Sequence, residues 1–520
     1  MSATVSRREL LKGRPAGARA LLPDPRGVQI GDPADLGVVE AAALLQARRL
    51  SSRELTEACL ARIEQRDPFL NAWVRTYPEL ALQQADAADQ RLAGARRGSL
   101  APLVCGIPLG LKDLYAVEGL PLTASSRVLE GNVARGDSTV WALLRRNGMV
   151  LLGHTQMHEF AAGVATPQTG NPWDPSRSPG GSSGGSGAAL GARMVPAATG
   201  SDTGGSLRSP ASACGVSSIK PTYGRVSTYG LIPCVWTLDH AGPMARSAAD
   251  VALLLDHIAE PDPRDPASLA PPPRPATYLC APTPGPRPLA GLRLGVPDGA
   301  ADSLPAGTAR LWASYLGEVR DLGATVVGFA APANEPSILS ALGEAWAYHQ
   351  QFGPAALARY TPEVAALVVA ARAAAESPTG DYIDYQRQRM RYANAWRETL
   401  AGLRLTAVLK PGSSVDGATR DQTTGLTIFT GSVSGDYGWA DAAGLPVAMT
   451  PVGRSASTGM PFGVQIGGAP HDEATLLRIA IDYQAAHPYW AEAPPEPPAA
   501  AGQANPAIGG LVSGQIPPGR

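Results

Sequence analysis

Residues 178–215 read SPGGSSGGSGAALGARMVPAATGSDTGGSLRSPASACG, two glycine- and serine-rich clusters separated by an apolar segment. A flexible linker of this composition would be solvated and would separate two domains. The flanking sequences argue against a linker, because GNPWDPSR (170–177) supplies turn residues and the residues after the first cluster are apolar. We therefore expect a tight turn that leads into a helix and then a strand.

Three known glycine motifs do not fit the first cluster. A phosphate-binding P-loop needs a lysine directly after its glycines, and no lysine follows here. A dinucleotide fingerprint and a nucleophile elbow centred on Ser183 both need a strand before the loop, whereas Pro179 and its neighbours predict none. The elbow also lacks an HGGG-type oxyanion segment.

The second cluster favours acyl-transfer chemistry instead. Ser206 follows Gly204 and Gly205, and consecutive glycines allow successive backbone N–H groups to converge on one oxyanion. A serine nucleophile needs a base, and Lys112 interrupts the apolar stretch GIPLGLKDLY. Taken alone, Lys112 is either an edge residue that reaches solvent or a buried amine whose lowered pKa makes it a base.

Composition limits the classes of partner. The chain has 520 residues, 44% of them hydrophobic and 17% charged, and a formal net charge of -1. This balance gives no electrostatic excess for binding nucleic acid or an anionic bilayer, so we expect neither partner. No apolar run approaches the roughly 20 residues of a membrane span. Reduced, mostly buried thiols are expected at the five cysteines, Cys59, Cys105, Cys214, Cys234 and Cys280.

Both ends of the chain are expected to be irregular. Residues 1–34 are rich in Arg, Gly and Pro, and residues 493–520 are predicted to form a disordered tail. Ser6–Lys12 resembles a twin-arginine export signal, but the apolar segment that such a signal requires is interrupted by Arg14 and Pro15. We predict a cytoplasmic protein, with twin-arginine export as the alternative.

The sequence between these ends predicts one α/β domain, residues 35–492. Two helices are expected within 35–68, the second starting with a capping box from Ser51 to Glu54. Short apolar runs between helical patterns predict strands, and such alternation is typical of a sheet with helices on both faces. These runs are 103–111, 149–153, 292–297, 324–329, 405–411, 445–453 and 462–468. The proline-dense stretch 261–288 is expected to be a long surface excursion.

Three segments together resemble the amidase signature family. They are GIPLGLKD (106–113), the glycine–serine block extended to 227, and GLPVAMTPVG with GMPFGVQIGGAPHDEATLLRIA (444–480). The resemblance extends from about residue 35 to residue 490. It implies a large central mixed β-sheet covered by helices on both faces, and hydrolysis of amides without a metal or organic cofactor.

The resemblance also implies roles for individual residues. Ser206 corresponds to the nucleophile, Ser182 to the bridging serine and Lys112 to the base, with a cis peptide bond between Gly181 and Ser182. Backbone N–H groups are expected to form an oxyanion hole at Thr203, Gly204, Gly205 and Ser206. Supporting residues are expected at Ser183, Asp202 and Arg208, the last two as an ion pair.

Several polar residues are expected to stay outside the chemistry. Lys220 is a rival base, but it matches a structural position in the family. Ser186 is expected to be a small loop residue. His154 and His158 are spaced like helical metal ligands, yet no third ligand is apparent, so we expect histidines at the surface or the pocket rim.

The substrate is expected to be a small or aryl linear carboxamide. The alternatives are the glutaminase (A) subunit of a tRNA-dependent amidotransferase and an ester or carbamate (urethane) hydrolase. Such glutaminase subunits commonly carry a sequence like NLAGLP, where this chain has DAAGLP with Asp441, preceded by Trp439. Pocket walls are expected from residues 120–135, 231–240 and 335–400, with Trp236 and Trp439 among them. Oligomeric state is left open, with a homodimer as one option.

Overall fold

The computed structural model describes residues 18–95, 101–268, 277–412, 418–420, 427–429 and 436–496. The twin-arginine segment and residues 497–520 of the predicted tail lie outside these ranges, so the predicted domain boundaries remain predictions. No helix in the described ranges is both long enough and apolar enough to span a bilayer.

An 11-stranded mixed sheet runs through the described structure in the order β1-β3-β2-β4-β6-β5-β12-β13-β9-β7-β8. Strands β2, β3 and β4 are parallel neighbours, as are β7, β8 and β9, and antiparallel pairs connect these two groups. The bounds are β1 Trp73–Thr76, β2 Pro108–Lys112, β3 Val150–Thr155, β4 Ala197–Asp202, β5 Ser217–Lys220, β6 His240–Ala245, β7 Arg293–Pro297, β8 Thr325–Phe329, β9 Ala407–Pro411, β12 Val447–Arg454 and β13 Pro461–Gly467. A separate pair contains β10 Ala418–Arg420 and β11 Thr427–Phe429.

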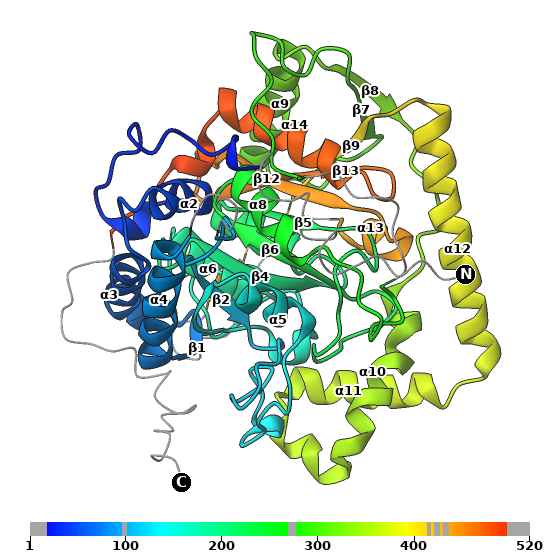
Figure 1. Ribbon diagram of the computed structural model, residues 1–520. Coiled ribbons are helices and arrows are strands. Elements are labelled where there is room, and N and C mark those ends of the chain that lie inside the picture. Colours follow the sequence, from blue (N-terminus) through cyan, green and yellow to red (C-terminus); the bar gives the residue numbers. More distant parts are fainter. Residues whose placement is uncertain are drawn as a thin grey trace, which may run out of the picture.

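Helices cover the sheet and extend beyond it (Figure 1). In the figure, α3 and α4 lie at one side of the molecule, while α10, α11 and the long α12 lie at the opposite side. The bounds are α2 Val38–Gln46, α3 Ser52–Leu70, α4 Pro78–Ala93, α5 Thr139–Arg146, α6 Gly184–Gly191, α7 Arg208–Cys214, α8 Ala248–Ile258, α9 Ala306–Asp321, α10 Leu342–His349, α11 Pro362–Ala375, α12 Thr379–Gly402, α13 Gly438–Ala443 and α14 Glu473–Ala486. The predicted α/β class and mixed sheet are confirmed.

Local sequence signals account for many of these elements. Each of the seven apolar runs overlaps a strand, and the two helices expected within 35–68 correspond to α2 and α3. The predicted capping box is present, since Ser51 Oγ accepts the Glu54 N–H and Glu54 accepts the Ser51 N–H at 2.8 Å. The apolar segment after the first glycine cluster forms α6 and β4, as expected.

The described part of the proline-dense stretch 261–288 contains neither helix nor strand, but it is not purely a surface excursion. Asp262, Asp265, Tyr278 and Leu279 are buried there. Their side chains dock the segment on the body of the protein: Asp262, for example, accepts a hydrogen bond from Ser227 Oγ at 2.9 Å. The five cysteines are unpaired, and three of them are fully buried.

Candidate active site

The candidate site lies at one edge of the sheet, where two parallel neighbours end. Strands β2 and β4 pair through Leu109 with Ala197, so their carboxyl ends emerge side by side. Lys112 is the last residue of β2 and Ser201 is the penultimate residue of β4. The ends of neighbouring parallel strands are a common location for binding and catalytic side chains in α/β proteins.

Lys112 is surrounded by three serine hydroxyls. Its Nζ lies 2.8 Å from Ser182 Oγ, 2.9 Å from Ser183 Oγ and 2.8 Å from Ser201 Oγ. The lysine side chain is fully buried, and this burial lowers its pKa to about 7, although Asp202 and Asp239 oppose the shift. A substantial fraction of the amine is therefore neutral near pH 7 and can accept a proton.

The loop that carries Ser182 has the geometry expected from the resemblance. The peptide bond between Gly181 and Ser182 is cis. The Ser182 carbonyl accepts hydrogen bonds from the His158 N–H at 3.0 Å and from Thr166 Oγ1 at 3.2 Å. These bonds and the start of α6 at Gly184 hold the Ser182 hydroxyl on the side of Lys112.

A glycine allows this loop to approach β4 closely. A Cβ atom at Gly200 would lie 2.9 Å from Ser183 Oγ and 2.6 Å from Leu207, so no larger residue fits without displacing a neighbour. Because of this close approach, Ser183 Oγ accepts a hydrogen bond from the Ser201 N–H at 3.3 Å. The first glycine–serine cluster and the strand before the second cluster are therefore directly hydrogen-bonded.

Ser206 lies in the loop between β4 and α7 and is 8% exposed. The Ser183 N–H donates to the Ser206 carbonyl at 3.3 Å, which joins the two serine loops through their backbones. At Gly205, φ is +124°, a conformation that favours glycine, and a Cβ there would lie 2.7 Å from the Tyr437 side chain.

One of the four predicted oxyanion donors is already engaged. The Gly205 N–H donates to Asp202 Oδ1 at 2.5 Å, so it is directed into the protein. The N–H groups of Thr203, Gly204 and Ser206 make no hydrogen bond to any described residue. Any oxyanion contact from this loop therefore relies on those three groups.

The predicted ion pair between Asp202 and Arg208 is present beneath the loop. Arg208 Nε lies 2.9 Å from Asp202 Oδ2, and Arg208 Nη2 lies 2.5 Å from Asp441 Oδ2. All three side chains are buried, and Arg208 also donates to the Tyr437 carbonyl at 3.0 Å. The Arg208 guanidinium holds the pKa of Asp202 well below its usual range despite burial, so this carboxylate stays charged and fixes the loop.

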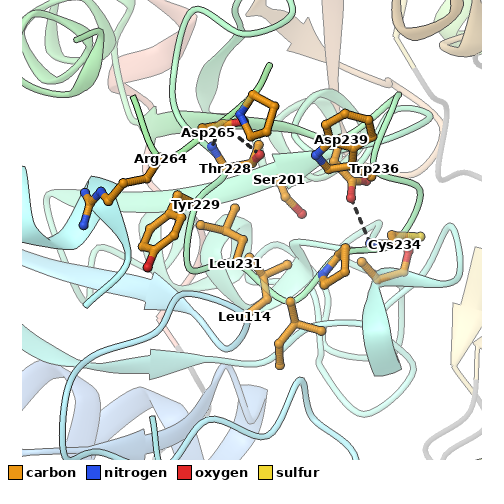
Figure 2. Close-up of a pocket in the computed structure, with 14 residues that line it drawn as sticks. Leu114, Ser201, Thr228, Tyr229, Leu231, Cys234, Trp236, Asp239, Arg264 and Asp265 are labelled. Atoms are coloured by element: carbon orange, nitrogen blue, oxygen red, sulfur yellow. Dashed lines mark hydrogen bonds between the residues drawn. The ribbon is translucent and has the colours of Figure 1, made fainter. Parts of the chain in front are cut away.

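A pocket of about 200 Å³ opens beside this cluster (Figure 2). Ser201 is part of its wall, whereas Ser182 and Ser206 do not line it. Its charged residues are engaged with the protein: Arg264 Nε lies 3.0 Å from Asp262, Asp265 accepts the Thr228 N–H at 2.6 Å, and Asp239 accepts the Cys234 N–H at 2.9 Å. The remaining wall is mostly apolar, from Leu114, Ala161, Tyr229, Leu231, Ile232, Pro233, Trp236 and Pro266.

The pocket only partly matches the predicted walls. Six residues of the predicted segment 231–240 line it, Trp236 among them, but residues 120–135 and 335–400 do not. The prediction for Trp439 is wrong, because this residue is 1% exposed and packs on Trp396 with a ring-centroid distance of 4.7 Å. Ser201 was not predicted, because it has no spacing signal of its own in the sequence.

The remaining polar candidates are buried and engaged elsewhere. Lys220 Nζ lies 3.0 Å from His240 Nε2, so its described contacts are outside the serine cluster. Ser186 Oγ donates to the Thr199 carbonyl at 2.8 Å. The expectation of surface or rim histidines is wrong: His154, on a strand rather than a helix, is buried and lies 2.9 Å from the Tyr77 hydroxyl, and His158 is also buried. No group of three His, Cys, Asp or Glu residues suited to a metal occurs in the described ranges.

Known proteins resemble this chain over most of its length. The family model described as Amidase matches residues 54–477. The (A) subunit of the glutamyl-tRNA(Gln) amidotransferase of Chloroflexus aggregans is 36% identical over 481 residues, which cover 86% of this chain and 96% of that protein. The structure of a peptide amidase from Stenotrophomonas maltophilia aligns with a TM-score of 0.75 at 29% identity, covering 89% and 98% of the two chains. The (A) subunit of the glutamyl-tRNA(Gln) amidotransferase of Thermotoga maritima aligns with a TM-score of 0.70 at 28% identity, covering 90% and 99%.

Proposed function

We propose, since this chain belongs to the amidase family, that it hydrolyses a small or aryl linear carboxamide to a carboxylic acid and ammonia or an amine. Membership of the family makes the protein a hydrolase that acts on carbon–nitrogen bonds in amides. The observation that carries the proposal is the contact of a fully buried lysine with serine hydroxyls, Lys112 Nζ to Ser182 Oγ at 2.8 Å.

The proposed reaction begins with proton transfer along the serines. Neutral Lys112 accepts the proton of the Ser182 hydroxyl while Ser182 accepts the proton of Ser206. Ser206 Oγ then attacks the amide carbonyl carbon and forms a tetrahedral intermediate. A pKa of about 7 suits this role, because the amine is neutral often enough to accept the proton and basic enough to hold it.

The intermediate then collapses to an acyl-enzyme. Its oxyanion accepts hydrogen bonds from the N–H groups of Thr203, Gly204 and Ser206, which have no described partner. The proton held by Lys112 returns through Ser182 to the leaving nitrogen, and the C–N bond breaks. Water, activated by the same serine relay, attacks the ester of Ser206 and releases the carboxylic acid.

The pocket supports an apolar substrate group. Its charged side chains, Asp239, Arg264 and Asp265, are already paired within the protein. A charged substrate group would therefore have to displace one of these contacts, whereas an aliphatic or aryl group fits the apolar wall without doing so.

The curated relatives favour a second candidate function, the glutaminase subunit of a tRNA-dependent amidotransferase. Relatives whose names place them in such an amidotransferase are 36% identical to this chain over 86% of its length. The same serine chemistry would release ammonia from glutamine. This candidate predicts a stable complex with partner subunits, whereas the first predicts an enzyme that works alone.

One panel of substrates separates the candidates. Purified protein and a Ser206→Ala variant are incubated with glutamine, aliphatic amides, anilides, aryl esters and aryl carbamates, and the release of ammonia, amine or phenol is measured. Turnover of amides or anilides that the variant lacks supports the first candidate. Turnover of glutamine alone supports the second, and turnover of only esters or carbamates would replace both with a hydrolase of that class. Amide turnover retained by Ser206→Ala would contradict the proposed mechanism.

A further inference from the structure

Asp239 is hydrogen-bonded both to the loop that carries Ser206 and to the 234–238 segment of the pocket wall. Its Oδ1 accepts a hydrogen bond from Thr203 Oγ1 at 2.6 Å, and Thr203 immediately precedes the two glycines before Ser206. Its Oδ2 accepts the Cys234 N–H at 2.9 Å, and Oδ1 also accepts the Val235 N–H at 3.1 Å. One carboxylate thus holds the nucleophile loop and the 234–238 segment of the pocket wall, as Figure 2 shows for Cys234.

The 234–238 segment is fixed at its outer end as well. The Thr237 N–H and hydroxyl donate to Glu344 of α10 at 2.8 and 2.7 Å, and Arg389 of α12 donates to the Thr237 carbonyl at 2.9 Å. Trp236, 46% exposed at the pocket, lies between these anchors and Asp239. A displacement of Trp236 by a substrate group therefore acts on a short segment that is tied at both ends.

Thr203 is well placed to pass such a displacement to the reacting atoms. Its side chain is buried and its hydroxyl is bonded to Asp239, while its own N–H has no described partner. Rotation or shift of this residue redirects the Thr203 and Gly204 N–H groups together, because they are adjacent in the chain. Oxyanion contacts are sensitive to such shifts, since their value depends on donors fixed before the reaction.

We propose that Asp239 is a positioning residue that couples filling of the pocket beside Trp236 to the alignment of the oxyanion donors through Thr203. The inference rests on the proposed function. A substrate group that fills the pocket holds the 234–238 segment in place, and Asp239 transmits that position to Thr203. Substrates with a group that fills the pocket then gain in turnover as well as in binding.

A purely structural role for the same contact makes a different prediction. If the Asp239 and Thr203 pair only stabilises the fold, its loss lowers the melting temperature and leaves kcat of the remaining folded enzyme unchanged. The Thr203→Val variant tests this, because valine keeps the shape of threonine and removes only the hydroxyl. Thr203→Ser keeps the hydroxyl and serves as the rescue variant.

The chain offers a matched control away from the site. Thr283 donates its hydroxyl to Asp482 at 2.8 Å in another threonine–aspartate pair, so Thr283→Val removes the same kind of bond. The probe is an alkyl fluorophosphonate, which labels an activated serine and whose phosphoryl oxygen uses the oxyanion donors. Labelling of Ser206 is followed by mass spectrometry, beside kcat and KM for the best substrate of the panel.

We expect Thr203→Val to lower kcat and the labelling rate by about 10- to 100-fold with KM changed by less than about threefold, because donors are misdirected rather than removed. Thr283→Val should stay within about threefold of the parent protein, and Thr203→Ser should restore most of the labelling rate that Thr203→Val loses. Should Thr203→Val fail to fold, Asp239→Asn is tested in its place, since the amide cannot accept at both of its ends.

A double-variant cycle tests the coupling itself. If the single effects were independent, kcat of the double variant Trp236→Ala/Thr203→Val would fall by their product. We expect its kcat to be at least about threefold higher than that value, because both substitutions interrupt the same path. Equal labelling of Ser206 in the parent and Thr203→Val, or independent single effects, would overturn the inference while the proposed function stands. No labelling and no turnover by the parent protein would overturn the proposed function, and this inference with it.

Discussion

The burial of Lys112 among three serines has its most direct consequence on the acid side of the pH–activity profile. Burial lowers the pKa of Lys112 from 10.5 to about 7, and only the neutral amine can accept a proton from Ser182. We expect kcat/KM to fall about tenfold for each pH unit below 7 and to level off above about pH 8. A Lys112→Met variant should lose about 10³-fold or more in kcat/KM at every pH.

The same shift predicts a dependence of stability on pH. The unfolded lysine keeps its proton up to about its ordinary pKa of 10.5, whereas the folded one loses it near 7. The unfolded chain therefore binds more protons in this window, and the free energy of unfolding rises with pH there. From about pH 7 to pH 9 the contribution of this one group is about 2 kcal/mol.

Urea unfolding of the parent protein and Lys112→Met at both pH values measures this contribution. The parent should gain about 2 kcal/mol more than the variant on going to the higher pH. Lys220→Met is the matched control, since Lys220 is also fully buried and burial lowers its pKa to about 8. For Lys220→Met, the free energy of unfolding should also rise less with pH than in the parent. Its kcat/KM should still fall below about pH 7, as in the parent.

Two results would refute the reasoning. One is a parent profile that stays flat between about pH 5 and 8, because a base with a pKa near 7 must lose activity there. The other is an equal rise in unfolding free energy for the parent and Lys112→Met, which would mean that Lys112 does not titrate in the predicted window. A Lys220→Met variant that alone removed the acid limb would show that the base had been assigned to the wrong lysine.

Four further substitutions probe the surroundings of Lys112 and its serines. Ser201→Ala removes an acceptor for the protonated amine of Lys112, so the acid limb should move to lower pH in the pH–rate profile. Arg208→Met leaves buried carboxylates without a counter-ion and should cost about 3–5 kcal/mol in denaturant unfolding. Trp439→Ala should cost about 3–5 kcal/mol in the same assay, whereas Trp236→Ala should lower kcat as well as raise KM for anilides in steady-state kinetics.

The sequence predicted strands best where they are apolar and uninterrupted. It did not predict β1, β5 or β6, and the last two include serine, glycine or proline, as in SSIK and HAGPMA. β5 and β6 form strands because neighbouring strands supply their hydrogen bonds on both sides, whereas β1 ends the sheet and pairs with β3 alone. Such support comes from tertiary contacts, which local propensity does not contain.

Polar partners were predicted only where a motif marks them. Ser182, Ser183, Asp202, Arg208 and the glycines lie within one continuous pattern, so their proximity followed from the resemblance. Ser201 and Asp239 carry no pattern of their own. The parallel pairing of β2 with β4 places Ser201 against Lys112, and the return of the chain before β6 places Asp239 against Thr203.

The sequence alone determined the residue types and their local order: a lysine at the end of an apolar strand, glycines that allow tight turns, and serines beside them. Only the tertiary structure decided which of these groups meet, which of them water can reach, and hence their pKa values. Trp236 and Trp439 illustrate the difference, since both were expected in the pocket and only one lines it. Local order is fixed by chain connectivity, whereas burial and long-range contact depend on how distant segments pack.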